Sequence, residues 1–161
     1  MNEFPLVYRL RVPVFGRGFV AGVEVRGHAL LVHEDDGAWW VSGVQPGGLA
    51  DTGDTPASAY AAFRNGLVNV LGDSEAQTDS FAAFAADVSR LLNQVSDADR
   101  VGWTEARARL RAGAVVTEPF LATLPREVGE VACGGDVVRL DDASGRLMSS
   151  ATVSDQLLQA A

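Results

Sequence analysis

The sequence predicts an α+β fold in which an antiparallel β-meander is covered by helices on one face. Three observations predict it. Apolar and polar residues alternate through the N-terminal third, which is typical of half-buried strands. The stretch Glu34-Asp35-Asp36-Gly37 separates two such runs and ends in Asp-Gly, a pair that favours a tight hairpin. Further along the chain, apolar residues recur at spacings of three and four, which indicates amphipathic helices.

Four strands are predicted in the N-terminal third: Leu6–Val14, Phe19–Arg26, Ala29–His33 and Trp39–Val44. Pro13 cannot donate a ladder hydrogen bond, so it is expected at a strand end or on a free edge. Gly27 is expected to break the chain between the second and third strands. Gln45–Ala50, which is rich in glycine, is expected to be a loop.

A helix is predicted after this loop. Asp54 or Thr55 is its expected N-cap, and Pro56 suits the first helical turn because the missing N–H costs nothing there. Gly72-Asp73-Ser74 is expected to end the helix.

A helical insertion is predicted at about 75–112. Phe81–Val95 carries the cleanest apolar stripe in the chain, which suits either burial or contact between two copies. A short helix at Glu105–Arg111 is expected to start near Thr104 and to close at Gly113.

Two more strands are predicted near the C-terminus, at Glu127–Ala132 and at Asp136–Leu140. Residues 1–140 are therefore expected to form one domain. Residues 141–161 are expected to be a polar tail.

Composition restricts the classes of function. The chain has 161 residues, of which 47% are hydrophobic, so it can form a real core. It carries 21 acidic and 13 basic residues, a formal charge of −8, and every basic residue is arginine. This balance disfavours direct nucleic-acid binding, which needs a positive surface, and suits a basic protein partner. No segment approaches the ~20 apolar residues of a membrane span, so a soluble cytoplasmic protein is expected.

Histidine and cysteine do not form a recognisable catalytic or metal site. His28 and His33 are five residues apart, which places them on opposite faces of a strand. A metal site that joined them to Glu34 and Asp35 would need a bend. Cys133 lies beside two glycines with no histidine partner in view, which favours a packed thiol over a nucleophile. No catalytic residue, metal ligand or cofactor is predicted.

Two carboxylate pairs could in principle hold Mg²⁺ or transfer protons: Asp35 with Asp36, and Asp51 with Asp54. Turn formation and helix capping explain all four residues without such chemistry. The interpretation we favour is that the chain is not an enzyme.

Trp39 and Trp40 are adjacent, so a strand directs one indole to each face. One is expected to pack under the helix. The other is expected to be an exposed anchor for a partner, since tryptophan is common at binding hot spots; the alternative is that the second helix covers both. The predicted partner-binding residues are Trp39, Trp40, Asp35, Asp36, Asp51 and Asp54.

The stretch from the acidic hairpin to the first helix resembles the HicB-like antitoxin family. The resemblance rests on an aromatic strand, a proline-glycine loop and Gly53-Asp54-Thr55-Pro56 opening a helix, and it covers about 31–71. A weaker match is Gly113–Pro119 followed by a strand. Gln45-Pro46-Gly47-Gly48-Leu49 lacks the aspartate that follows the proline in the family.

The resemblance implies a non-catalytic module that binds a small basic ribonuclease toxin and covers its active site. Family members usually carry a C-terminal DNA-binding segment, and the tail at 141–161 is too short and too polar for a helix-turn-helix. Two alternatives remain open: an acidic immunity-type inhibitor of unrelated fold, and a homo-oligomeric scaffold joined through Phe81–Val95.

Overall fold

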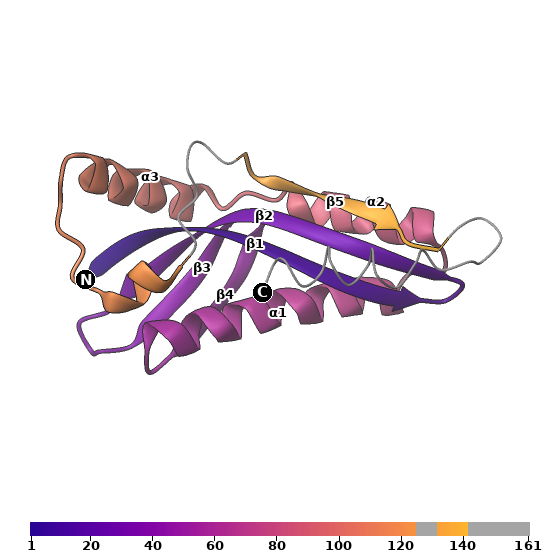
Figure 1. Ribbon diagram of the computed structural model, residues 1–161, viewed down its shortest axis with the longest axis horizontal. Coiled ribbons are helices and arrows are strands. Elements are labelled where there is room, and N and C mark those ends of the chain that lie inside the picture. Colours follow the sequence, from indigo (N-terminus) through magenta and orange to yellow (C-terminus); the bar gives the residue numbers. More distant parts are fainter. Residues whose placement is uncertain (125–131, 142–161) are drawn as a thin grey trace.

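A computed structural model describes residues 1–124 and 132–141. Within these residues, five strands form one antiparallel sheet, three α-helices pack on it, and one short 3₁₀ helix follows (Figure 1). The predicted α+β class with an antiparallel meander is confirmed. The strands are β1 (Asn2–Gly16), β2 (Phe19–His33), β3 (Trp39–Gln45), β4 (Gly47–Gly53) and β5 (Gly134–Arg139). The helices are α1 (Pro56–Ala76), α2 (Phe81–Leu92), α3 (Asp97–Arg111) and the 3₁₀ helix η1 (Pro119–Thr123).

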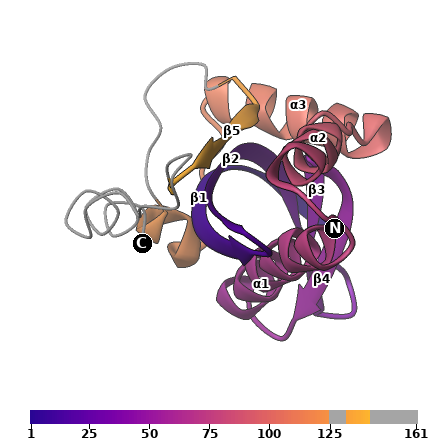
Figure 2. The same ribbon diagram turned by 90° about the vertical axis from the view of Figure 1, so that its right-hand side faces the viewer.

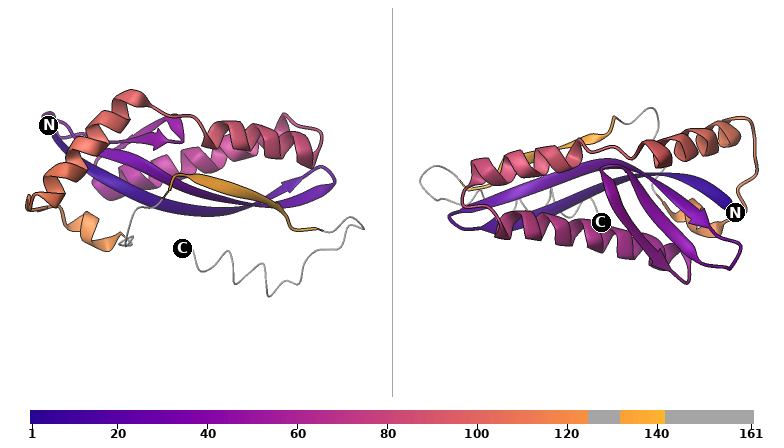
Figure 3. Two further views of the ribbon diagram at one scale, coloured as in Figure 1. Left: turned by 90° about the horizontal axis from the view of Figure 1, so that it is seen from above. Right: turned by 180° about the vertical axis from the view of Figure 1, so that it is seen from behind.

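Strand β2 organises the sheet. Strand β1 pairs with it along its whole length, from Asn2 opposite His33 to Gly16 opposite Phe19. The other edge of β2 is shared: β3 pairs with its second half and β5 with its first half, as the views in Figure 3 show. Strand β4 then continues the meander on the far side of β3.

Gly27 does not break β2, so the prediction of two separate strands there was wrong. The ring of Tyr8 on β1 lies across this position, and a Cβ at Gly27 would be 2.4 Å from its Cζ. The absence of a side chain at Gly27 therefore leaves room for the ring of Tyr8. Its low strand propensity is outweighed by pairing with β1 on one side.

The predicted loop at Gln45–Ala50 is also wrong, since most of it belongs to β4. The turn between β3 and β4 is held by the connection between α2 and α3. The Gly47 N–H donates to the Gln94 carbonyl (2.9 Å), and the Ser96 N–H donates to the Val44 carbonyl (2.9 Å). These partners are about fifty residues away along the chain, so no local pattern could have indicated them.

One face of the sheet, the core face, carries Leu6, Tyr8 and Leu10 of β1 and alternate residues of β2. Helices α1 and α2 cover it. The fully buried side chains at its centre are Phe63, Leu67 and Leu71 of α1, with Phe84 and Val88 of α2. Most of the apolar stripe predicted at Phe81–Val95 is thus used inside the chain, although the helix itself ends at Leu92 and Val95 is exposed.

The opposite face, the outer face, carries Arg9, Arg11, Glu24 and Arg26. Helix α3 crosses one end of it, where Trp103 and Ala106 pack on Leu30 and Val44. Figure 2 shows α1 and α3 on opposite sides of the curved β1–β2 pair. The expectation that helices cover one face holds for α1 and α2 but not for α3.

The helices begin at capping residues, only some of which could be predicted from the sequence. Thr55 is the N-cap of α1 and forms a capping box with Ser58, as one of the two expected alternatives had it. Helix α1 continues through Gly72-Asp73-Ser74 to Ala76, because Ser74 is buried and donates a hydrogen bond to Asp87 of α2. Helix α3 starts after Ser96, well before the predicted Thr104.

The C-terminal predictions are partly outside the described residues. Gly113 follows α3 with φ of 90°, a conformation that favours glycine at a helix end, as expected. The predicted strand at Asp136–Leu140 corresponds to β5. The predicted strand at Glu127–Ala132 falls almost entirely outside the described residues, as does the tail beyond Asp141.

Asp141 links the end of β5 to the start of β2. Its carboxylate accepts hydrogen bonds from the Arg139 guanidinium (3.0 Å) and the Val20 N–H (2.9 Å), and its side chain is 7% exposed. The Arg139 hydrogen bond, followed by that of Val20, lowers the pKa of Asp141 from 3.8 to about 2. A carboxyl group with a depressed pKa in the folded state stabilises the fold above its unfolded pKa.

We therefore expect the free energy of unfolding of the wild-type chain to decrease as the pH falls from about 4 to about 2. Asp141→Asn has no carboxyl group at this position, so it is not expected to show this part of the decrease. The free energy of unfolding, measured by urea denaturation at a series of pH values, tests this. Val138→Ala, an exposed neighbour on β5, is the control and keeps the wild-type pH dependence. Identical acid sensitivity of wild type and Asp141→Asn would contradict the prediction.

Candidate protein-binding site

One end of the sheet collects most of the residues predicted to bind a partner. The turn between β2 and β3 lies there, and Trp39, directly after it, pairs with Gly53 at the end of β4. The connection from β4 to α1 is therefore beside the hairpin turn, at the left of Figure 1. We call this region the hairpin end and define it by Asp35, Asp36, Trp40 and Asp54.

The two tryptophans lie on opposite faces of β3, as alternation predicted. Trp39 is 8% exposed and stacks between His33, with ring centroids 4.1 Å apart, and Phe4 at 6.2 Å. Trp40 is on the outer face and is 39% exposed. Its cross-strand neighbours are Val32 of β2 and Thr52 of β4. Of the pair, Trp40 alone has the exposure that an anchor needs.

Three of the predicted carboxylates lie at the hairpin end and are exposed. Asp36 accepts a hydrogen bond from the Ala38 N–H (2.9 Å), which is the turn-forming role expected of it. Asp35 forms an ion pair with the Met1 amino group at 2.6 Å, and this hydrogen bond lowers the pKa of Asp35. Asp54 precedes the Thr55 cap of α1.

Asp51 is separated from this group. Its partner in β3 is Val41, a buried residue of the core face, so Asp51 also points to the core face. There it lies against α1: a Cβ at Gly66 would be 2.9 Å from Asp51 Oδ2. A partner that contacts Trp40 on the outer face would not reach it from the same side.

The histidines lie on opposite faces, as predicted, and each stacks on an indole. His28 stacks on Trp103 with ring centroids 4.0 Å apart, and His33 stacks on Trp39. Within the described residues, no group of three or more histidine, cysteine, aspartate or glutamate residues could hold a metal ion. The structure therefore does not bring the candidate ligands His28, His33 and Glu34 together.

Cys133 lies just before β5 and is half-buried. Burial raises the pKa of its thiol, and a backbone hydrogen bond with His28 opposes this. A nucleophilic cysteine needs the opposite shift, toward the thiolate. The prediction of a packed thiol fits this environment.

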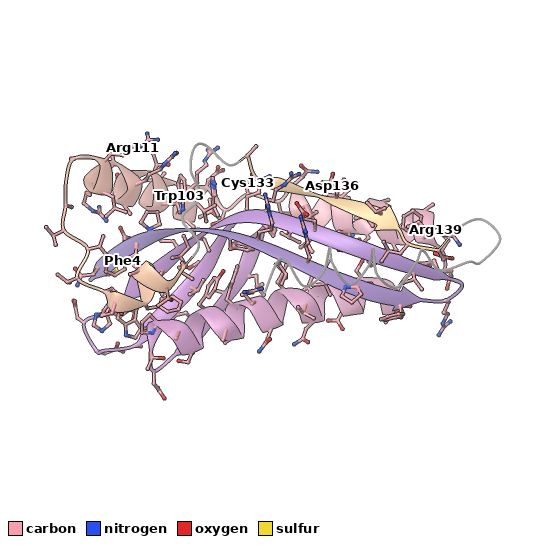
Figure 4. The ribbon with its side chains drawn as sticks, viewed as in Figure 1. Phe4, Trp103, Arg111, Cys133, Asp136 and Arg139 are labelled. Carbon is pink, nitrogen blue, oxygen red and sulfur yellow. The ribbon has the colours of Figure 1, made fainter. Side chains whose placement is uncertain are left out.

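A cluster of charges on the outer face could not be predicted from the sequence. We call it the arginine cluster, and it consists of Arg9, Arg11, Glu24, Arg26 and Asp136. Glu24 is its centre, because Arg11 contacts it at 2.6 Å, Arg9 at 3.7 Å and Arg26 at 3.9 Å. Arg26 also contacts Asp136 of β5 at 3.3 Å. Figure 4 shows Asp136 beside the part of β2 that α3 leaves uncovered. Alternation placed Arg9 and Arg11 on a polar face, but only the register with β2 brings Glu24 between them.

A shallow groove of about 400 Å³ lies between α2 and the connection that leads into it from α1, and is lined by Gln77, Thr78, Asp87 and Arg90 among others. Its charged groups are paired with one another. The Ser74 hydroxyl donates to Asp87 (2.6 Å) and lowers its pKa, and Arg90 binds the other carboxylate oxygen. The charged groups of the groove, Asp87 and Arg90, therefore already form an ion pair with each other.

Comparisons with protein-family models, with curated proteins and with solved structures give no match to this chain. Among the helices in the part of the chain that the structure describes, none combines the length and the apolar character needed to cross a membrane.

Proposed function

We propose that this chain is a protein-binding module that neutralises a small basic protein, in the way that its resemblance to HicB-like antitoxins implies. The observation that carries the proposal is the exposed indole of Trp40 at the hairpin end, the end of the sheet that also carries the exposed carboxylates Asp35, Asp36 and Asp54. The chain contributes a surface to the partner and supplies no catalytic group.

The surroundings of Trp40 suit a binding anchor. Strand β3 lies between β2 and β4, so hydrogen bonds hold its backbone on both sides. Trp39, the next residue, is fixed in the core between two aromatic rings. An indole held on a rigid strand loses little conformational freedom on binding, which favours affinity.

The charge of the chain supports a basic partner. The net charge is −8 and the isoelectric point is about 4.6. Exposed carboxylates at the same end of the sheet as an apolar anchor accelerate encounter with a basic protein and disfavour acidic ones. A basic ribonuclease, which must itself attract RNA, has the complementary charge; the proposal places this pair in the cytoplasm.

The residues that carry the family resemblance lie in the same region. Gly53-Asp54-Thr55-Pro56 forms the connection from β4 to α1, and Gly53 pairs with Trp39. This placement supports a contact surface that uses the hairpin and the start of α1 together. Asp51 is left out of the proposed contacts because it faces α1.

The test uses the protein encoded next to this gene as the binding partner. It is co-expressed with the chain, purified, and titrated by calorimetry against wild type and Trp40→Ala. Loss of a tryptophan hot spot costs about 2 kcal/mol or more, so Trp40→Ala is expected to weaken binding by about thirtyfold. The partner's ribonuclease activity is expected to fall when an equimolar amount of the wild-type chain is added.

Val138→Ala is the matched control, since Val138 is 52% exposed and lies on β5, away from the hairpin end. It is expected to bind like wild type. Equal affinities of wild type and Trp40→Ala would remove the hairpin end from the interface. An adjacent product that is acidic or fails to bind would contradict the antitoxin-like role.

A further inference from the structure

Strand β1 is an edge strand whose outer side meets no other strand within the described residues. In the sheet order β1-β2-β3-β4, β1 is terminal, and β5 pairs with β2 instead. Such an edge offers a row of backbone N–H and C=O groups to which another strand can add. At 15 residues, β1 is longer than most strands.

The register shows which residues of β1 direct their backbone outward. The Val20 N–H donates to the Asp141 side chain and its carbonyl accepts from the Leu140 N–H, so the backbone of Val20 points away from β1. Because direction alternates along an antiparallel ladder, Phe15, the partner of Val20, points away from β2. The same then holds for Arg11, Arg9 and every second residue before them.

The prolines of β1 agree with this assignment. Pro5 and Pro13 both belong to the outward-pointing set, where a missing N–H removes no hydrogen bond to β2. Pro13 was expected at a strand end or on a free edge, and within the described residues it lies on the edge strand of the sheet. Between them, Val7, Arg9 and Arg11 have N–H groups that point outward.

The same residues place positive charge beside the edge. Side chains of Arg9 and Arg11 lie on the outer face, in the arginine cluster, where three guanidinium groups face two carboxylates. Arg9 is the least satisfied: its side chain is 42% exposed, and its ion-pair contact with Glu24 is 3.7 Å long. The cluster has one positive charge in excess on a chain whose net charge is −8.

We propose that the edge of β1 between Pro5 and Pro13 binds an acidic peptide segment as an added antiparallel strand. Residues of that segment opposite Arg9 and Arg11 would be glutamate or aspartate, because opposite charges are favoured in directly facing cross-strand positions. The alternate residues would be apolar or β-branched, since on the core face β1 carries Leu6, Tyr8 and Leu10. This site is separate from the hairpin end and does not depend on its function.

Two other occupants fit less well. A second copy of the chain that added through β1 would, in the centred registers, place arginine opposite arginine, and such like-charge pairs are destabilising. A nucleic acid could use the positive charge but not the alternating backbone donors and acceptors of the edge. The acidic balance of the whole chain also opposes it.

The probe is a fluorescein-labelled, end-blocked peptide, Thr-Glu-Val-Glu-Val-Glu-Thr, whose binding to the full chain is followed by fluorescence anisotropy. In the proposed pairing, the glutamate N–H groups point to β1 and those of valine point away. N-methylation of the central glutamate is expected to abolish binding, whereas N-methylation of a neighbouring valine is expected to leave it unchanged. This pair of peptides separates strand addition from simple charge attraction.

The matched protein variants are Arg9→Glu and Arg17→Glu, which change the charge equally. Arg9→Glu places like charges opposite each other and is expected to weaken binding by about tenfold. Arg17 lies in the β1–β2 turn, about 20 Å along the strand from Arg11, and its variant is expected to bind almost like wild type.

Several results would overturn the proposal. They are absence of peptide binding, equal binding of the two N-methylated peptides, and equal affinities of the two arginine variants. Tighter binding of oligo-dT than of the peptide would assign the cluster to nucleic acid. A dimer in sedimentation that Arg9→Glu strengthens would assign the edge to a second copy.

Discussion

Phe63→Ala is expected to lower the free energy of unfolding by about 3–5 kcal/mol, the usual cost of truncating a buried aromatic residue. Phe63 is 0% exposed and lies at the centre of the core face, where α1 meets the sheet. Its ring makes an edge-to-face contact with Tyr8 of β1, with centroids 5.4 Å apart. Truncation would leave a cavity and remove this contact. Since domains of this size are stable by only about 5–15 kcal/mol, the variant should be close to unfolding.

Urea denaturation followed by tryptophan fluorescence measures the effect. Val68→Ala is the matched control, because Val68 lies on the same helix and is 37% exposed. Its loss should stay within about 0.5 kcal/mol. A loss below about 1 kcal/mol for Phe63→Ala would contradict the packing of α1 on the core face.

Elements with a strong local pattern could be predicted from the sequence. Alternation in Leu6–Val14 identified β1, because a sheet with one covered face demands period two. Thr55 followed by Pro56 identified the start of α1 through capping chemistry, which involves only neighbouring residues. Gly113 identified the end of α3 for the same kind of reason.

Elements that depend on distant contacts could not be predicted. Gly27 looked like a strand break, but its small size leaves room for the ring of Tyr8, which lies nineteen positions earlier in the chain. The turn before β4 looked like a loop because its hydrogen-bond partners, Gln94 and Ser96, belong to the connection between two later helices. In both cases tertiary contacts outweighed local propensity.

In the candidate sites, too, features set by local alternation could be predicted, whereas features set by distant contacts could not. Alternation placed Trp39 and Trp40 on opposite faces of a strand, but which of them is exposed depends on the faces that the helices cover. Asp51 and Asp54 looked equivalent in the sequence, yet strand direction sends Asp51 toward α1. The arginine cluster required the register between β1 and β2, which a single sequence does not specify.

Trp103→Ala is expected to release α3 from the outer face while the core face stays folded. Trp103 is 6% exposed, stacks on His28 and donates a hydrogen bond from Nε1 to the Leu6 carbonyl (3.0 Å). It is the largest member of a small cluster that holds α3 and is separate from the main core. A helix of this length is marginal alone in water, so α3 should lose its structure once this contact is removed.

Amide hydrogen exchange measured residue by residue tests this, since it reports local and global opening separately. Protection should fall throughout α3 (Asp97–Arg111) but remain in α1, with a total loss of about 3 kcal/mol. Trp103→Phe keeps an aromatic ring on His28 and loses the hydrogen bond, so it should cost about 1 kcal/mol and leave α3 protected. Equal loss of protection in α1 and α3 for Trp103→Ala would instead show that both faces of the sheet unfold as one cooperative unit. In that case the packing of α3 on the outer face stabilises the core face as well, and α3 cannot open independently of α1.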